Sequence, residues 1–569
     1  MNLLPAPRSA SFLGGVVAAS PARVARGAGL PAQGYRLRVR PSGDCDVDAA
    51  DDAGAFYAEA TLAQLARVHG GCLPVGEVED WPDLPVRGVM LDVSRDKVPT
   101  MATLEAMVDR LASWKVNQLQ LYMEHTFAYA AHAEVWRSAS PFTPDELRSL
   151  DAYCRTRHVE LVPNQNCLGH FERWLRHPAY RGLALCPEGF EQYGRWRAPT
   201  TLDPANPAAF ALVRSLLGEL LPNFSSGRVH VGLDEPFELG WDRFEDYLSW
   251  VRRLRALPEL DGREMLMWGD LAGARPESLG ALPDGVTVCE WWYDAGWSWA
   301  ARGDVYRRAG RPWWACPGTS SWLTLLGRWD NAIADIDEAV DGALASGAAG
   351  MLVTDWGDQG HLQYLPVSEP GLAWAAAQAW CRAANQGLDL AAALDAHCFS
   401  DAAGVLGAVL RQVGNAYLEI APQFPNLSTL ALHLYFPEMD VGRGLTEGIT
   451  AAQVEAADAA LAGGAARLAA ARPAREDGGL VVDELTTAIE LVRLLCRDAL
   501  LRLDGDGSLA SVAAPRRVEL AEALAAVTAR HRELWLARNR EGGLDDSVAW
   551  LAALERCYRS GSTTRPTGP

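Results

Sequence analysis

Lysine is almost absent from this chain of 569 residues: only Lys97 and Lys115 occur, while arginine, alanine and glycine are abundant. We attribute this imbalance to genomic base composition and infer no function from it. Acidic residues outnumber basic ones, the net charge is −20 and the pI is about 5.1. This balance disfavours nucleic acid and anionic membranes as partners, and it favours neutral or cationic ligands.

Long hydrophobic runs are missing as well. No stretch of about 18 apolar residues occurs, so the sequence predicts no transmembrane helix. The apolar stretch 12–19 is short and broken by glycine, which makes it a poor secretory signal. The cysteines are scattered, odd in number and without a Cys-x-x-Cys pair, which favours reduced thiols. We therefore expect a cytoplasmic protein without a membrane partner.

Several catalytic signatures are absent too. The chain has no His-x-His pair, which a metal-dependent barrel hydrolase usually carries on its first strand, and no His-Glu-x-x-His site. It also lacks a Gly-x-Ser-x-Gly elbow and a phosphate-binding Walker loop. We therefore expect neither a metal nor another cofactor, and we consider reactions that carboxylates can perform.

The spacing of apolar residues divides the chain into regions. Residues 34–39 alternate as a strand and residues 53–68 have helical spacing, so we predict a small α+β domain at 1–82. From residue 86 to about 360, strand-like and helix-like segments alternate. The predicted strands are 86–93, 118–123, 159–163, 228–233, 265–268, 286–291, 313–316 and 350–354.

Eight such units within about 270 residues predict an α/β fold, a (β/α)8 TIM barrel at residues 83–370. An open doubly wound sheet is the alternative, but no glycine fingerprint follows the first strand, where Asp92 to Arg95 stand instead.

Beyond residue 371 the strand signals vanish, and long Ala/Leu-rich segments predict a C-terminal helical domain at 371–569. We interpret the polar segment 538–547 as an exposed loop in preference to a contact with the barrel or with a second subunit, and a homodimer stays open. The predicted helices are 371–385, 402–418, 451–471, 483–503 and 516–540.

The segment 228–235 carries the most informative chemistry, because a β-type run ends there in Gly232-Leu233-Asp234-Glu235. Adjacent side chains of a strand point to opposite faces, so the two carboxylates can face one ligand only where the strand has ended. The glycine eases such a turn. Paired carboxylates at the carboxyl end of a barrel strand suit acid/base catalysis.

Tryptophans stand beside acids at other predicted strand ends. Trp268, Trp291 and Trp356 each lie within two residues of a carboxylate, and Glu124 and His170 follow the second and third strands. Indole faces can pack against the C–H faces of a sugar ring, while Asp and Arg bind its hydroxyls. The pattern therefore favours a carbohydrate ligand.

Several motifs resemble those of the family 20 glycoside hydrolases, the β-N-acetylhexosaminidases, and they occur in that family's order. The segment 53–65 is similar to the small domain that precedes the family's barrel, and the helical C-terminal third is similar to a cytoplasmic bacterial branch. The motifs are 87–95 on the first strand, 115–122 on the second, Gly169-His170, the signature His230 to Glu235, and Trp356-Gly357-Asp358.

The resemblance implies an exo-acting, retaining β-N-acetylhexosaminidase that releases terminal β-linked GlcNAc or GalNAc from an amino-sugar glycan. In this family the substrate's 2-acetamido oxygen attacks the anomeric carbon and forms an oxazolinium ion, an exception to the two-carboxylate scheme. Glu235 would be the general acid and then the base, and Asp234 would orient the acetamido group. The other implied residues are Arg87 and Asp358 for the outer hydroxyls, Trp268, Trp291 and Trp356 around the ring, and His170 in the charge network.

This sequence departs from the family pattern in places. Glu124-His125-Thr126 stands where the family has Thr-Asp-Asp, and Asn166 stands where it has an acid, so Glu124 and His125 are the candidates for replacement support. The family's acetamido-binding tyrosine has no counterpart near the seventh strand, and Tyr293 is our candidate. These replacements leave two alternatives: a glycan-binding protein on an inactivated hydrolase scaffold, and a barrel glycosidase with a covalent carboxylate nucleophile.

Overall fold

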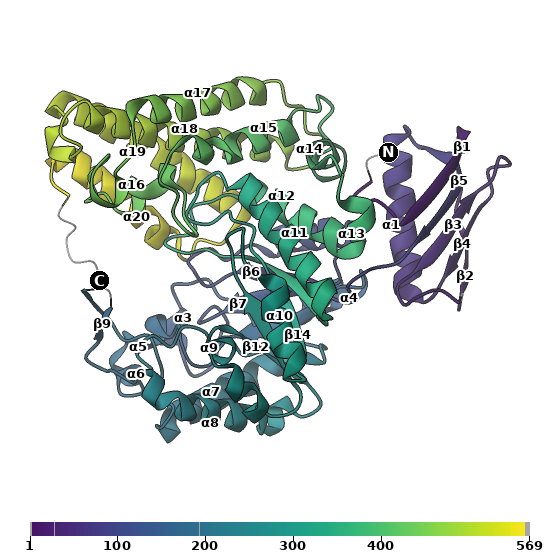
Figure 1. Cartoon of the computed structure of the whole chain (residues 1–569), viewed down its shortest axis with the longest axis horizontal. Coiled ribbons are helices and arrows are strands. Elements are labelled where there is room, and N and C mark those ends of the chain that lie inside the picture. The colour runs from purple at the N-terminus through teal and green to yellow at the C-terminus, as the bar shows by residue number, and fades with distance from the viewer. Residues whose placement is uncertain (1–2, 28, 193, 564–569) are drawn as a thin grey trace.

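A computed structural model of the chain describes residues 3–27, 29–192 and 194–563. Its centre is the predicted closed barrel of parallel strands, in the order β6-β7-β8-β11-β12-β13-β14-β15 (Figure 1). All eight predicted strands are present, although β11 ends before the predicted residue 233. The barrel strands are β6 (Arg87–Asp92), β7 (Gln118–Met123), β8 (Glu160–Gln165), β11 (Arg228–His230), β12 (Glu264–Trp268), β13 (Val286–Trp291), β14 (Trp313–Cys316) and β15 (Gly350–Asp355).

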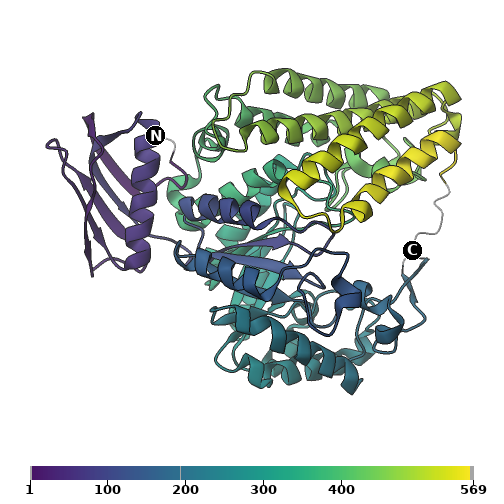
Figure 2. The same cartoon turned by 180° about the vertical axis from the view of Figure 1, so that it is seen from behind.

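Helices connect the strands and surround the barrel (Figures 1 and 2). Local sequence sets their ends: in α4, Thr143 caps the first turn, Pro144 opens the helix and Glu146 bonds back to Thr143. The helix that directly follows β12 is the short α9 (Asp270–Ala274), which lies close to the carboxyl ends of the strands. The longer helices are α2 (Met101–Ser113), α4 (Pro144–Arg155), α7 (Pro207–Leu220), α8 (Phe244–Arg255), α10 (Trp299–Arg308), α11 (Trp329–Ser346) and α12 (Leu365–Trp380).

The N-terminal domain is a sheet in the order β1-β5-β3-β4-β2 with a helix packed on one face. The predicted strand at 34–39 and helix at 53–68 are confirmed. The apolar stretch 12–19 falls largely within strand β1, where Gly14 and Gly15 adopt positive φ and interrupt the pairing with β5. The elements are β1 (Ser9–Ala18), β2 (Arg23–Arg26), β3 (Tyr35–Val39), β4 (Cys45–Ala49), α1 (Asp52–Val68) and β5 (Cys72–Asp80).

A buried ion pair joins this domain to the barrel. Lys115, which precedes β7, places its Nζ 2.8 Å from Asp80 Oδ2 at the end of β5, and both side chains are buried. Asp80 also accepts hydrogen bonds from the Tyr35 hydroxyl and from the indole N–H of Trp380, each at 2.8 Å. One carboxylate therefore binds groups from both the domain and the barrel.

The C-terminal region is helical, as predicted, and lies against one side of the barrel in both views (Figures 1 and 2). The last helix, α20, is an addition to the predicted set. No helix within the described residues is long and apolar enough to cross a membrane. The helices are α13 (Arg382–Asn385), α14 (Leu390–Leu394), α15 (Leu406–Gly414), α16 (Leu432–Tyr435), α17 (Ala451–Leu468), α18 (Gly478–Leu503), α19 (Ala514–Arg538) and α20 (Leu544–Ser560).

The segment 538–547 is not an exposed loop, so that interpretation of its polarity was wrong. The backbone N–H of Arg540 donates to Val98 O at 2.8 Å, and its guanidinium contacts Glu146 Oε1 at 2.8 Å. The N–H of Gly542 donates to the hydroxyl of Ser140 at 2.9 Å. Arg540 and Gly542 thus bind the barrel, including the loop that follows β6, whereas Arg538 pairs with Glu484 of the C-terminal region.

Replacing Lys115 with methionine should destabilise the protein, because the Asp80 carboxylate would keep only neutral donors in the interior. Removing one partner of a buried pair costs about 3–5 kcal/mol, so we expect that loss in the free energy of unfolding by denaturant titration. Arg516→Met is the matched control, since it removes an exposed ion pair with Glu519 of the same 2.8 Å separation. Equal midpoints for the two variants would contradict a bridging role for Lys115.

Candidate active site

The chain turns sharply after β11 and presents both carboxylates to one cavity. The strand ends at His230, and positive φ angles follow at Gly232 (69°), Leu233 (76°) and Glu235 (44°). A side chain at Gly232 would lie 2.6 Å from Asn166 Cγ, so the tight packing there requires glycine. Because the strand ends before the acid pair, Asp234 and Glu235 can face the same cavity.

Asp234 is the more enclosed of the two acids, with a side chain 9% exposed. Its Oδ1 accepts a hydrogen bond from Asn166 Nδ2 at 2.7 Å, and its Oδ2 lies 3.3 Å from His170 Nε2. Burial alone would raise the pKa of Asp234, but the charge and close contact of His170 and the Asn166 bond outweigh it and lower that pKa. Asp234 is therefore ionised near neutral pH.

Glu235 has the opposite character. Burial raises its pKa, and the negative charges of Asp234 and Asp358 add to that rise, while His170 opposes it from 3.6 Å. Its side chain is still 38% exposed, so the carboxyl can reach a ligand. Its backbone N–H donates to Asp270 Oδ2 at 3.0 Å, which fixes the turn. Two neighbouring acids whose pKa values are driven apart are suited to different roles.

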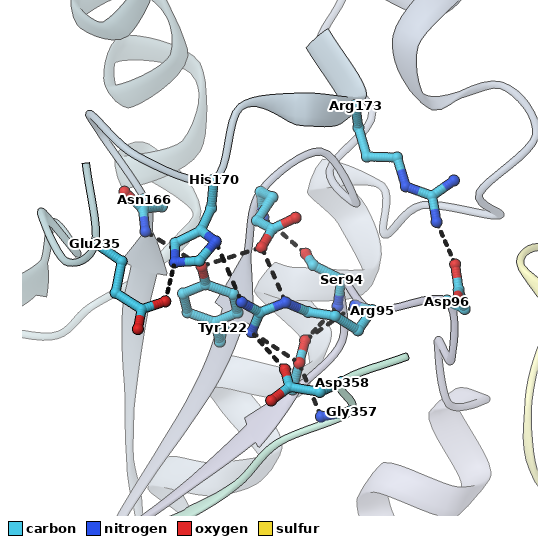
Figure 3. Close-up of polar contacts among 12 residues, drawn as sticks. Ser94, Arg95, Asp96, Tyr122, Asn166, His170, Arg173, Glu235, Gly357 and Asp358 are labelled. Carbon is cyan, nitrogen blue, oxygen red and sulfur yellow. Dashed lines mark hydrogen bonds and ion pairs between the residues drawn. The ribbon is translucent and has the colours of Figure 1, made fainter. Parts of the chain in front are cut away.

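His170 is the positive group beside both acids, and Figure 3 shows its contact with Glu235. Burial opposes its protonation, but the negative charge of Asp234 outweighs burial and raises the pKa of His170 to about 10. Its Nδ1 lies 3.4 Å from Nη2 of Arg95, and this like charge also fails to outweigh Asp234. The residue has a positive φ of 54°, so its backbone turns to bring the ring over the acids.

Arg95 lies on the other side of His170 and faces the cavity (Figure 3). Its Nη1 is 3.1 Å from Asp92 Oδ2, its Nε is 3.2 Å from Glu124 Oε1, and Asp358 is 3.9 Å away. Burial alone would lower the pKa of Arg95, but these neighbours hold it well above its ordinary value. Burial raises the pKa of Glu124 to about 7. Arg95 and Asp358 thus offer donors and acceptors to a polyhydroxylated ligand.

Arg87 does not reach this site, so its prediction as a substrate-binding residue was wrong. It opens β6, at the amino end of the barrel, and its Nε donates to Lys115 O at 2.8 Å. Its Nη2 donates to Gln33 Oε1 at 2.8 Å, and its guanidinium lies 4.9 Å from the Trp380 ring centroid. Arg87 joins the N-terminal domain to the barrel, and Arg95, after the carboxyl end of the same strand, takes the position at the site.

Glu124 and His125 are the two residues considered as replacements for the family's acid, and they have different surroundings. Glu124 contacts Arg95, whereas burial holds the pKa of His125 well below its ordinary value, so that imidazole is neutral. Asn166 itself donates to Asp234, and also to the Tyr122 hydroxyl at 3.2 Å. The amide that replaces the family's acid is thus in direct contact with Asp234.

Aromatic rings form the opposite wall. Trp291 stacks on Tyr293 with centroids 5.2 Å apart, and Trp268 lies 5.8 Å from Trp356. The Trp356 indole N–H donates to the Tyr293 hydroxyl oxygen at 2.8 Å. Burial raises the pKa of Tyr293 well above its ordinary value, so the phenol stays protonated. A phenol that accepts one N–H can still donate its own proton to a ligand.

These walls enclose a small cavity of about 90 Å³. Arg87 and Glu124 are the predicted site residues outside its lining. The lining consists of Arg95, His170, Asp234, Glu235, Trp268, Trp291, Tyr293, Trp356, Asp358 and Asn426. The described residues hold no cluster of three or more His, Cys, Asp or Glu side chains placed to bind a metal.

Asn426 is a lining residue that the sequence analysis missed. It belongs to the C-terminal region and has a left-handed φ of 57°. Its backbone N–H donates to Asp294 Oδ2 at 3.1 Å, and Arg328 holds that carboxylate at 2.6 Å. No sequence signal marks Asn426, because it follows no barrel strand. Arg95 could have been identified, because it follows the carboxyl end of β6, where barrel site residues lie.

Comparison with known proteins agrees with this architecture. A family model described as glycosyl hydrolase family 20, catalytic domain, matches residues 84–267, and one described as domain 2 of that family matches residues 17–81. A beta-hexosaminidase from Akkermansia muciniphila is 30% identical over 239 residues, which cover 38% of this chain and 47% of that protein. A beta-hexosaminidase subunit A1 from Dictyostelium discoideum is 26% identical over 186 residues, covering 31% and 34%. The matched segments thus span less than half of either relative.

Solved structures share the fold. A family 20 beta-N-acetylhexosaminidase from Streptomyces coelicolor has a TM-score of 0.54 at 22% identity, covering 68% of this chain and 84% of that one. The crystal structure of another beta-N-acetylhexosaminidase has a TM-score of 0.57 at 21% identity, covering 70% and 95%. Identity at this level shows the fold alone. The two family matches thus identify residues 17–81 as similar to domain 2, and residues 84–267 as similar to the catalytic domain, of glycosyl hydrolase family 20.

Proposed function

We propose that the chain is an exo-acting, retaining β-N-acetylhexosaminidase that hydrolyses terminal β-linked GlcNAc or GalNAc. The observation that carries this proposal is the pair Asp234 and Glu235, adjacent in sequence, facing one cavity, with pKa values displaced in opposite directions. Two neighbouring acids whose pKa values are displaced in opposite directions can take different roles in acid/base chemistry.

The first step needs a proton donor and a nucleophile. The substrate's acetamido oxygen forms a bond to the anomeric carbon while the glycosidic C–O bond breaks, and Glu235 gives its proton to the leaving oxygen. Asp234 accepts a hydrogen bond from the acetamido N–H and stabilises the positive charge that develops on the oxazolinium ring. The match to the family's catalytic domain, which includes Glu235, and the raised pKa of Glu235 support this assignment.

The second step reverses the roles of Glu235. Its carboxylate removes a proton from water as the water oxygen bonds to the anomeric carbon and the bond to the acetamido oxygen breaks. Two displacements at one carbon retain its configuration, and Glu235 recovers its proton. Tyr293 would donate to the acetamido oxygen, and Trp268, Trp291 and Trp356 would surround the ring and the acetamido methyl.

The outer hydroxyls would be held on the opposite side by Arg95 and Asp358. Their charges are close enough to orient one another, with 3.9 Å between Nη1 and Oδ1. The scattered cysteines, none of them in a Cys-x-x-Cys pair, suit the cytoplasmic location that we propose.

Isosteric variants of the two acids provide the first test. Glu235→Gln should reduce kcat on an aryl β-N-acetylglucosaminide roughly 100- to 10,000-fold, because no acid remains to protonate the leaving group. Asp234→Asn should reduce kcat roughly 100- to 1,000-fold through lost charge stabilisation, with an unchanged circular dichroism spectrum. Wild-type rates in either variant would remove that residue from the mechanism.

The same assay separates the alternatives. A thiazoline mimic of the oxazolinium ion should inhibit the protein, and aryl β-glucosides, which lack the acetamido group, should not be cleaved. A glycosyl-enzyme trapped by a fluorosugar would instead indicate a covalent carboxylate nucleophile. Sugar binding without turnover would indicate an inactivated scaffold.

Arg95 and Arg87 offer a matched pair of substitutions. Arg95→Met should cost about 2–5 kcal/mol of transition-state stabilisation, measured from kcat/KM, because Asp358 and Glu124 lose their charged partner. Arg95→Lys should lose less, since it keeps the charge without the planar fork. Arg87→Met should leave kcat/KM unchanged in the folded fraction while lowering the unfolding midpoint. A loss of kcat/KM in Arg87→Met but not in Arg95→Met would contradict the assignment of Arg95 to the site and of Arg87 to the domain contact.

The charge of His170 should set the pH range of activity. His170 lowers the pKa of both acids, so His170→Asn should raise both pKa values. Asp234 must be ionised and Glu235 protonated, so both limbs of the pH profile of kcat/KM should move to higher pH. The acidic limb should move further, because His170 lies nearer to Asp234. His69→Asn, in the N-terminal domain, is the control; an unshifted profile for His170→Asn would contradict the charge assignment.

A further inference from the structure

The backbone of Glu235 adopts a conformation that a glutamate disfavours. Its φ angle of 44° lies in the left-handed region, and Leu233, two residues earlier, has a φ of 76°. A side chain other than glycine raises the free energy of such a backbone, which persists only where its surroundings hold it in place. The contacts around this turn therefore decide where the Glu235 carboxyl group lies.

Two residues hold the turn from different sides. A side chain at Gly169 would lie 2.5 Å from Asp234 O and 3.4 Å from the carbonyl carbon of Glu235, so the chain packs tightly there. Asp270 Oδ2 accepts the backbone N–H of Glu235 at 3.0 Å. Among the described residues no other hydrogen bond reaches the Glu235 backbone, so Asp270 is its directional tether.

Local sequence brings Asp270 to this position. It opens α9 directly after β12, and the residue between them is Gly269. A side chain at Gly269 would lie 2.9 Å from both Glu290 Oε2 and the Tyr306 hydroxyl, so a larger residue would push the start of α9 away from the barrel. The glycine thus lets the carboxyl group of Asp270 reach the neighbouring turn.

The surroundings of Asp270 disfavour a negative charge on it. Its Oδ1 is buried and has no hydrogen-bond partner, and it forms no ion pair with any described residue. The titratable groups that face it are the acids Asp234 and Glu235 and the phenols of Tyr247 and Tyr306. Burial, followed by the charge of Asp234, raises the pKa of Asp270 to about 8. A proton on Oδ1 leaves Oδ2 free to accept the N–H.

We propose that Asp270 is a positioning residue for the general acid, and that this role requires its acceptor oxygen but not a negative charge. The inference rests on the proposed function, in which Glu235 protonates the leaving oxygen. A neutral carboxyl group holds the turn without adding a third charge beside Asp234 and Glu235. A displacement of about 1 Å in a catalytic group can cost about 100-fold in rate, so the tether has a measurable effect.

Two substitutions at Asp270 separate the acceptor from the charge. Asp270→Asn keeps an acceptor oxygen, so it should retain kcat/KM on phenyl β-N-acetylglucosaminide within about threefold. Asp270→Ala leaves the Glu235 N–H without a partner and should lower the same kcat/KM roughly 10- to 100-fold. The asparagine variant tests the proposal even if the alanine variant does not fold.

The dependence on the leaving group separates positioning from a merely structural role. A dinitrophenolate is a weak base and leaves with little protonation, so Asp270→Ala should cost less than about threefold on the 2,4-dinitrophenyl glycoside. Asp151→Ala is the matched control, because Asp151 Oδ1 accepts the backbone N–H of Ser225 at 3.1 Å, ahead of β11. It should lower the unfolding midpoint and leave the ratio of the two substrates unchanged.

The remaining results would each overturn an identifiable statement. Equal losses on both substrates in Asp270→Ala, or no loss on either, would show that Asp270 does not act through the general acid. A loss in Asp270→Asn as large as that in Asp270→Ala would show that the charge or the proton is required. If the unsubstituted protein cleaves neither glycoside, the proposed function itself fails, and this role of Asp270 fails with it.

Discussion

The chemistry of this site depends on the interaction of the His170 imidazolium with two neighbouring carboxyl groups. The imidazolium lies 3.3 Å from Asp234 and 3.6 Å from Glu235, and its charge opposes the burial that would otherwise raise both pKa values. At Asp234 the opposition succeeds, because His170 contacts the carboxylate directly and Arg95 and Asn166 add to its effect; at Glu235 burial prevails. The pKa values of two neighbouring acids are thus displaced in opposite directions, which suits them to different roles.

The cationic neighbour of His170 at the site, Arg95, lies in the loop after β6. Arg95 approaches the histidine from that loop, and the residues that follow it are tied to the C-terminal helices: Asp96 pairs with Arg173, which also holds Asp546, and Val98 O accepts from Arg540. The C-terminal region is therefore part of the support of the site. It also supplies a residue to the lining itself, Asn426.

Much of this arrangement is readable in the sequence, for physical reasons. Buried parallel strands need dense apolar runs, so all eight strands are visible, and barrel geometry brings the acids and tryptophans at their ends together. Arg87 and Arg95 flank the same strand, and only the direction of the strand decides which one reaches the site. The segment 538–547 looks solvated because its partners are distant in sequence, and Asn426 enters from a loop that no strand precedes.

The partial exposure of Glu235 leaves its carboxyl group open to a ligand. A general acid must be desolvated enough to keep its proton at neutral pH and open enough to reach the leaving oxygen, and a side chain 38% exposed satisfies both conditions only in part. A bound substrate would cover part of this open side and remove water from the carboxyl group. Desolvation then raises the pKa of Glu235 further, so binding of the leaving group itself would favour the protonated acid that its departure requires.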